Sequence, residues 1–260
     1  MVFVKKDKYN ISDLLKIMEF LRSENGCPWD KVQTHESIRK NFIEETYEVI
    51  EAIDTNDIPL MREELGDVLL QVVFHARMEE EVGHFNFDDV VDELCKKLVL
   101  RHPHVFGEVS ASNADEALSS WDKAKKESKH QSDSDTLIAV SKALPALMRA
   151  DKVGSRASKV GYDFADAKAA IAKLKSEIVE LEEALDTPNA LDEMGDVLFS
   201  AVNVARKLGI DSEICLGAST DKFINRFKEA EKIARNNGTS LKDLDESQLD
   251  EIWEQAKKQL

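Results

Sequence analysis

Glycine, proline and aromatic residues are scarce in this chain of 260 residues. It has ten glycines and five prolines, and 7% of its residues are aromatic. A β-sandwich needs many turns, so this composition argues against one. No run of residues alternates polar and apolar side chains well enough to require a strand. We therefore expect an all-α protein.

Cysteine and long apolar runs are also in short supply. The three cysteines, Cys27, Cys95 and Cys215, are odd in number and lack metal-type spacing, which is typical of reduced thiols. The longest apolar stretch lies around residues 68–76 and is far too short to span a bilayer. Residues 1–6 show no signal peptide. We expect a soluble, cytoplasmic protein without a membrane partner.

Basic residues are fewer than acidic residues. The chain has 35 Lys and Arg against 51 Asp and Glu, which gives a formal net charge of −16. An acidic surface repels phosphate backbones, so we expect no nucleic-acid partner. The excess acid is compatible with cation binding, or simply with a well-solvated surface.

Helical periodicity dominates the sequence. The expected helices cover about residues 12–24, 35–54, 58–82, 87–101, 113–129, 141–152, 166–186, 189–208, 212–237 and 246–258. N-caps are expected at Ser12, Thr34 and Asp211, and helix ends at Gly83, Gly209 and Gly238. The pattern His102-Pro-His104 is interpreted as a helix-ending turn.

A polar stretch at residues 127–135, rich in serine and aspartate, has no apolar face and is the natural linker. We predict an N-terminal helical domain at residues 1–128, a linker at 129–140 and a C-terminal helical domain at 141–260. A long surface loop within one domain is the alternative.

The two halves look like copies of each other. Glu45-x-x-Glu48 precedes Glu64-Leu-Gly-Asp67 in the first half. In the second half, Glu177-x-x-Glu180 precedes Glu193-Met-Gly-Asp196. Matching positions keep an offset of 125 to 132 residues through both halves. The sequence therefore predicts tandem duplicated helical-bundle modules.

These eight carboxylates are the candidate metal ligands. Residues i and i+3 share a helix face, so each pair projects to one side. The helix that carries Glu64 and Asp67 is apolar all round, which predicts burial, and a buried carboxylate is protonated, paired or metal-bound. We expect the same for Glu193 and Asp196. An all-oxygen ligand set favours Mg²⁺, with Mn²⁺ as a substitute, over zinc. A di-iron site would need Glu-x-x-His, which none of the pairs has.

Basic and aromatic residues recur downstream of each acid set. Their spacing places two cations one turn apart, followed by a tryptophan four residues before a lysine, a pattern that suits phosphate binding beside a stacking surface. The residues are Lys97, Arg101, Trp121 and Lys125 in the first half, and Lys222, Arg226, Trp253 and Lys257 in the second.

Six strings of residues are distinctive. They are Asn25-Gly-Cys-Pro-Trp-Asp30, Glu44-Glu-Thr-Tyr-Glu48, Glu64-Leu-Gly-Asp67, Arg101-His-Pro-His-Val-Phe106, Leu144-Pro-Ala-Leu-Met148 and Glu193-Met-Gly-Asp196. Through them the chain resembles the MazG family of nucleoside triphosphate pyrophosphohydrolases over essentially its whole length. The resemblance implies Mg²⁺-dependent cleavage of nucleoside triphosphates to monophosphate and pyrophosphate, and a homodimer. It also implies that the C-terminal half carries the principal activity, with metal ligands at Glu177, Glu180, Glu193 and Asp196. It further implies nucleotide contacts at Lys222, Arg226, Trp253 and Lys257.

The second half departs from the family pattern Glu-Glu-x-x-Glu at Ser176, which stands where the first half has Glu44. A helical wheel places this position at the edge of the ligand face, on the Glu180 side. Asn203 stands where the first half has Phe74, and its amide is the expected contact for a base or sugar. On balance we expect the second half to be the better catalyst, with Lys222, Arg226 and Lys257 stabilising the leaving pyrophosphate.

Two other functions are compatible with the same residues. One is a non-catalytic regulatory dimer that senses nucleotide or binds a partner protein, and the other is a purely structural helical dimer. Mg²⁺-dependent nucleotide binding without product identifies the first. The second predicts no rise of the melting temperature with Mg²⁺.

Overall fold

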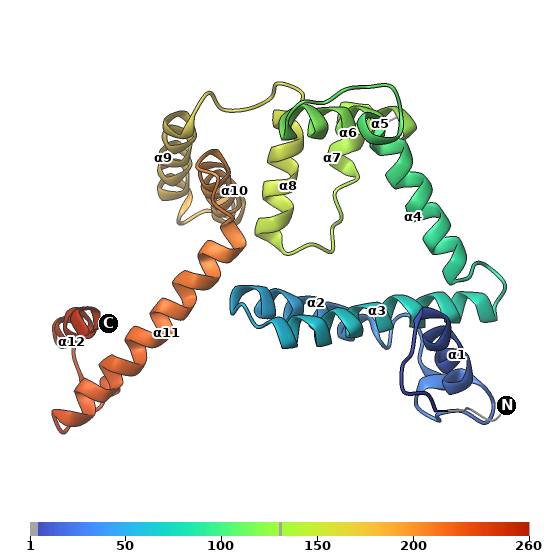
Figure 1. The fold of residues 1–260 in the computed structure, drawn as a ribbon. Helices are drawn as coiled ribbons and strands as arrows, with labels where there is room; N and C mark the ends of the chain where they lie inside the picture. The colour runs from blue at the N-terminus through green and yellow to red at the C-terminus, as the bar shows by residue number, and fades with distance from the viewer. Residues whose placement is uncertain (1–4, 130–131, 260) are drawn as a thin grey trace. The chain divides into compact units, whose positions relative to one another are not determined.

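A computed structural model describes residues 5–129 and 132–259, and every regular element in it is helical (Figure 1). Helix accounts for 74% of the described residues, and no strand occurs among them. The predicted all-α class is confirmed.

The chain divides into two units, Met1–Lys129 and His130–Leu260, each packed mainly within itself. The helices of unit 1 are α1 (Ile11–Arg22), α2 (Arg39–Asp54), α3 (Ile58–Glu81), α4 (Phe87–Arg101), α5 (Pro103–Phe106) and α6 (Ala114–Lys129), with a 3₁₀ turn at Asp30–Val32. The helices α2 and α3 form its largest helix–helix contact, and α1 packs on α3. Met18, Val73 and Phe74 lie in the core between α1 and α3. From there α4 leads to α5 and α6 (Figure 1).

Unit 2 contains α7 (Asp133–Ile138), α8 (Ala146–Ser158), α9 (Ala167–Ala184), α10 (Ala190–Lys207), α11 (Ser212–Asn236) and α12 (Glu246–Gln259), with a 3₁₀ turn at Leu241–Asp243. The helices α9 and α10 form its main pair, and α8 packs against α10. The long helix α11 carries α12 at its far end, over a core that includes Ala230, Ala234 and Ala256 (Figure 1).

Two short helices were not expected from the sequence. The first, α5, includes Pro103 and His104, which were predicted to form a turn; the preceding helix does end before them, at Arg101. The second, α7, begins after Ser132 and lies within the predicted linker, of which residues 130–131 are outside the described chain. The helix expected from residue 141 begins instead at Ala146, because Pro145 caps it and a residue before proline avoids the helical region.

Helix ends were predicted better than helix starts. Gly83, Gly209 and Gly238 all follow helix C-caps with positive φ, which glycine adopts without strain, as expected. Asp211 caps α11, also as expected.

The other two predicted caps are wrong. Asn10 caps α1 in place of Ser12, through a capping box with Asp13. The helix α2 begins only after Ile38, because Thr34 forms a separate turn with Ser37.

The expectation that α3 is buried on every side is wrong for one face. Leu65 and Leu69 are 51% and 38% exposed. The reason is geometric, because α1 and α2 leave the far side of α3 uncovered within this unit. Glu64 lies on the covered side and is buried, 8% exposed.

Candidate metal centres and substrate contacts

The first acid cluster lies between α2 and α3. Glu45 and Glu48 are one turn apart on α2, and Glu64 faces them from α3. One carboxylate oxygen from each lies within 4.8 Å of the others. Asp67 is one turn beyond Glu64, close enough for its charge to act on Glu45 and Glu64. The structure thus brings three of the predicted ligands together and places the fourth next to them.

The carboxylates of this cluster repel one another. Desolvation by burial raises the pKa of Glu64, and the charges of Glu48 and Asp67 raise it further. Desolvation likewise raises the pKa of Glu45, followed by the charge of Asp67. Among residues 5–129 and 132–259, no cationic side chain forms an ion pair with Glu45, Glu48 or Glu64. Crowded acids of this kind fit a hard divalent cation.

The second acid cluster lies between α9 and α10. Oxygens of Glu177, Glu180 and Glu193 lie within 4.8 Å of one another. Glu177 is buried, 5% exposed, and burial raises the pKa of Glu193, with added repulsion from Glu180 and Asp196. Asp196 itself is exposed, so the expectation that it faces the interior is wrong for this chain. Its charge still reaches Glu193 from the next turn of α10.

Two neighbouring side chains shape the second cluster. Lys173 Nζ lies 2.5 Å from Glu177 Oε1 and 3.8 Å from Glu180 Oε1. Ser176 Oγ donates a hydrogen bond of 2.8 Å to Glu180 Oε1, on the side that the helical wheel predicted. Lys173 was not predicted from the sequence. Its spacing, four residues before Glu177, was the available signal.

Arg101 and Lys125, two of the three predicted cations of unit 1, lie against the ring of Trp121. The Arg101 guanidinium lies 5.3 Å from the Trp121 ring centroid, and Lys125 Nζ lies 4.9 Å from it. Lys97 is exposed on α4, one turn before Arg101. Trp121 is thus covered by cations of its own unit.

In unit 2 the matching tryptophan, Trp253, lines an open pocket. The ring centroids of Trp253 and Phe223 lie 5.1 Å apart, and both residues line a pocket of about 320 Å³ together with Phe227 and Asp250. Lys222 and Arg226 lie one turn apart on α11, and each directly precedes one of these phenylalanines in the sequence. Lys257 forms an ion pair with Glu254 on α12.

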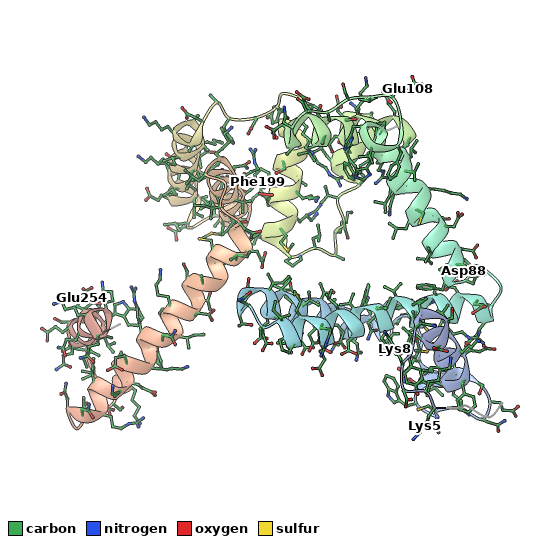
Figure 2. All side chains as sticks on the ribbon, viewed as in Figure 1. Lys5, Lys8, Asp88, Glu108, Phe199 and Glu254 are labelled. Atoms are coloured by element: carbon green, nitrogen blue, oxygen red, sulfur yellow. The ribbon has the colours of Figure 1, made fainter. Side chains whose placement is uncertain are left out.

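The acids and the cations occupy different helix pairs in each unit. The helix α12 packs on α11, while the second acid cluster belongs to α9 and α10. Figure 2 shows Glu254 of α12 and Phe199 of α10 in well-separated parts of unit 2. The structure therefore assembles the two predicted sets separately and does not join them within one unit.

Asn203 is held by protein partners. Its amide donates to the Phe199 carbonyl at 3.1 Å and accepts from Arg206 Nη2 at 3.0 Å, beside Gly154 of α8. Contact with a nucleotide base would require these bonds to rearrange. In unit 1, Phe74 is a core residue against α1.

These features define a class of protein: an all-helical chain with two carboxylate clusters suited to hard divalent cations, each accompanied by a cationic and aromatic helix pair. No helix in the part of the chain that the structure describes is both long and apolar enough to cross a bilayer.

Comparison with known proteins narrows this class to one family. The MazG nucleotide pyrophosphohydrolase domain model matches residues 33–106. A nucleoside triphosphate pyrophosphohydrolase/pyrophosphatase MazG from Thermotoga maritima is 44% identical over 245 residues, which cover 94% of each chain. A nucleoside triphosphate pyrophosphohydrolase from Escherichia coli K12 is 42% identical over 256 residues, 96% of this chain and 97% of the relative. The chain therefore belongs to the MazG family of nucleotide pyrophosphohydrolases, which confirms the family and the class of enzyme predicted from its residues.

Proposed function

We propose that the chain hydrolyses ribo- or deoxyribonucleoside triphosphates to a nucleoside monophosphate and pyrophosphate, with Mg²⁺ as cofactor and Mn²⁺ as a substitute. The observation that carries the proposal is the convergence of three carboxylates, one of them buried, between α9 and α10. The names and 42–44% identity of the relatives support the substrate class.

The roles of the side chains follow from their chemistry. Glu177, Glu180, Glu193 and Asp196 would hold the cation, which when bound neutralises phosphate charge and lowers the pKa of a water. Lys222 and Arg226 contact phosphate oxygens, and the arginine does so through a bidentate pair of hydrogen bonds. Lys257 stabilises the negative charge that develops on the departing pyrophosphate.

The difference between the two tryptophans supports the C-terminal half as the principal catalyst. Phe223, Phe227 and Trp253 line an open pocket of about 320 Å³, and its apolar, aromatic walls suit a nucleobase. Trp121 lies beneath Arg101 and Lys125, so a base would have to displace these cations to stack on it. We propose that Lys97, Arg101, Trp121 and Lys125 form a weaker nucleotide site.

We further propose a homodimer in which a second copy completes each site. The chain exposes 18584 Å², whereas even two compact domains of half its 29.3 kDa would expose only about 14,000 Å². Apolar side chains such as Leu65, Leu191 and Leu198 account for part of the excess, at 51%, 87% and 53% exposure. Since the acids and cations lie apart within each unit, the helix pair α11–α12 of one copy is proposed to cover the carboxylates of another.

The test is a pair of matched double variants. Glu193→Gln/Asp196→Asn is expected to lower Mg²⁺-dependent pyrophosphate release by at least about a hundredfold, because the cation loses two ligands while the helices remain. Glu64→Gln/Asp67→Asn is expected to lower it much less. Circular dichroism checks the helix content of both. Near-normal release from the first variant would refute catalysis by the C-terminal cluster, and nucleotide binding by the unaltered chain without product would point to a regulatory dimer.

A further inference from the structure

The two acid clusters differ by one cation. In the second cluster the ammonium of Lys173 lies 2.5 Å from an oxygen of Glu177 and 3.8 Å from one of Glu180. The Glu177 side chain is only 6% exposed, while that of Lys173 is 46% exposed. The lysine therefore reaches from the surface and places its charge against an inward-facing carboxylate.

The first cluster has no such partner. The internal repeat aligns Glu177 with Glu45 and Lys173 with Asn41, both at an offset of 132 residues. An amide carries no charge, and within the described parts of the chain no cation forms an ion pair with Glu45, Glu48 or Glu64. The negative charge of the second cluster is thus partly neutralised by a neighbouring lysine, whereas that of the first cluster is not.

This difference acts on metal binding through simple electrostatics. A divalent cation and an ammonium group favour the same carboxylate oxygens, so occupancy by one opposes occupancy by the other. Since half of the Lys173 side chain is already solvated, its ammonium can withdraw into water on its flexible stem when a cation enters. Within the described residues, the first cluster has no cationic side chain that a metal ion would have to displace.

We propose that Lys173 is a built-in counter-ion of the C-terminal carboxylate cluster, which competes with the divalent cation for Glu177 and Glu180 and makes this cluster load metal more weakly than the N-terminal one. The inference rests on the proposed function, because it takes both clusters to be metal sites. It assigns Lys173 a role in setting metal affinity.

The experiment measures Mn²⁺ binding by electron paramagnetic resonance on the full chain without nucleotide. Glu64→Gln/Asp67→Asn silences the first cluster so that the second is observed alone. In this background Lys173→Met is expected to tighten Mn²⁺ binding about tenfold, since a competing charge near a half-solvated pair is removed. It is also expected to lower the metal-free melting temperature, because the acids lose their counter-ion. A gain of affinity cannot arise from misfolding.

Two further variants complete the design. Lys175→Met removes an equally charged, exposed lysine from the same helix and is expected to change nothing. Asn41→Lys, measured with the second cluster silenced by Glu193→Gln/Asp196→Asn, is expected to weaken Mn²⁺ binding at the first cluster.

The possible results distinguish a failure of the counter-ion role of Lys173 from a failure of the proposed function. Unchanged or weaker Mn²⁺ binding by Lys173→Met, or an equal gain from Lys175→Met, would overturn the counter-ion role and leave the metal sites standing. Absence of Mn²⁺ binding to the unaltered chain would overturn both. Pyrophosphate release from the unaltered chain, measured in the same experiment, shows whether the chain is catalytic even if it binds no Mn²⁺.

Discussion

Asp163, in the loop between α8 and α9, shows how single side chains connect the helices of unit 2. Arg206 of α10 donates to it through two nitrogens, and Lys207 Nζ lies 3.1 Å from Oδ2. These partners, Arg206 first, hold the pKa of Asp163 well below its usual range. The loop that leads into α9, and so toward the second acid cluster, is anchored by this carboxylate.

Asp163→Asn is expected to lower the free energy of unfolding at pH 7 by on the order of 1 kcal/mol, because the pair remains partly solvated. A carboxylate with a depressed folded-state pKa stabilises above its unfolded pKa, and this contribution fades as the pH falls toward the folded value. The gap in melting temperature between the unaltered chain and the variant should therefore be widest above about pH 5 and narrow below pH 4. Calorimetry across this range checks it, and a constant gap would contradict the assignment.

At the residue scale, the identities of the candidate metal ligands were predictable from the sequence, but their burial and their neighbours were not. Glu177 and Glu193 were singled out by their spacing, by its repetition in both halves and by the family resemblance. That Glu177 is the buried member and Asp196 the exposed one depends on how α9 and α10 rotate against each other. Lys173 was overlooked because a lysine on an acidic helix is an ordinary surface residue until its neighbours are known.

At the scale of elements, the α8–α10 contact depends on a missing side chain. A Cβ atom at Gly154 would lie 2.9 Å from Asn203 Oδ1 and 3.0 Å from Arg206 Nε. Both of these atoms are fixed by their mutual hydrogen bonds. The glycine therefore lets α8 approach the hydrogen-bonded Asn203–Arg206 pair closely.

Gly154→Val is expected to destabilise the chain by about 2 kcal/mol through overpacking at this contact. Gly217→Ala is the matched control, since nothing lies within 4 Å of the added atom on α11. That change should stabilise by roughly 0.5–1 kcal/mol through helix propensity. Urea unfolding measures both. Equal effects of the two substitutions would show that the close approach has no energetic weight.

Helix boundaries were also predictable only where a local requirement fixes them. The glycines that end α3, α10 and α11 were predicted because a positive φ is a local requirement that few residues meet. The start of α2 was missed because Thr34 and Ser37 satisfy each other in a turn that competes with helix capping. The short helix α7 was missed because its first four residues are polar and its six residues are too few to show a helical period.

At the scale of the whole molecule, the proposed sharing of sites between copies has a sharp test. Glu193→Gln/Asp196→Asn removes the acids from one copy, and Lys222→Ala/Arg226→Ala removes the cations from the other. If each site combines the acids of one copy with the cations of its partner, a mixed dimer regains one intact site of two. Co-expression with random pairing should then restore roughly a quarter of the activity.

The alternative outcome is equally clear. If each site lies within one chain, mixing two inactive variants restores nothing, because every chain still lacks one half of its own site. Size-exclusion chromatography with light scattering shows whether dimers are present. A monomer that is fully active would overturn the proposed dimer.

The sequence by itself determined the helical class, the repeat of the acid pairs and the family. Each of these depends on residue spacing within a segment or on matching strings, and such signals need no knowledge of the neighbouring segments. Only the tertiary structure decided which three carboxylates meet in each cluster, that Lys173 compensates one of them, and that the cations lie on a separate helix pair. These facts depend on the crossing of helices that are distant in sequence. The same crossing leaves one face of α3 uncovered, where the apolar pattern alone predicted burial.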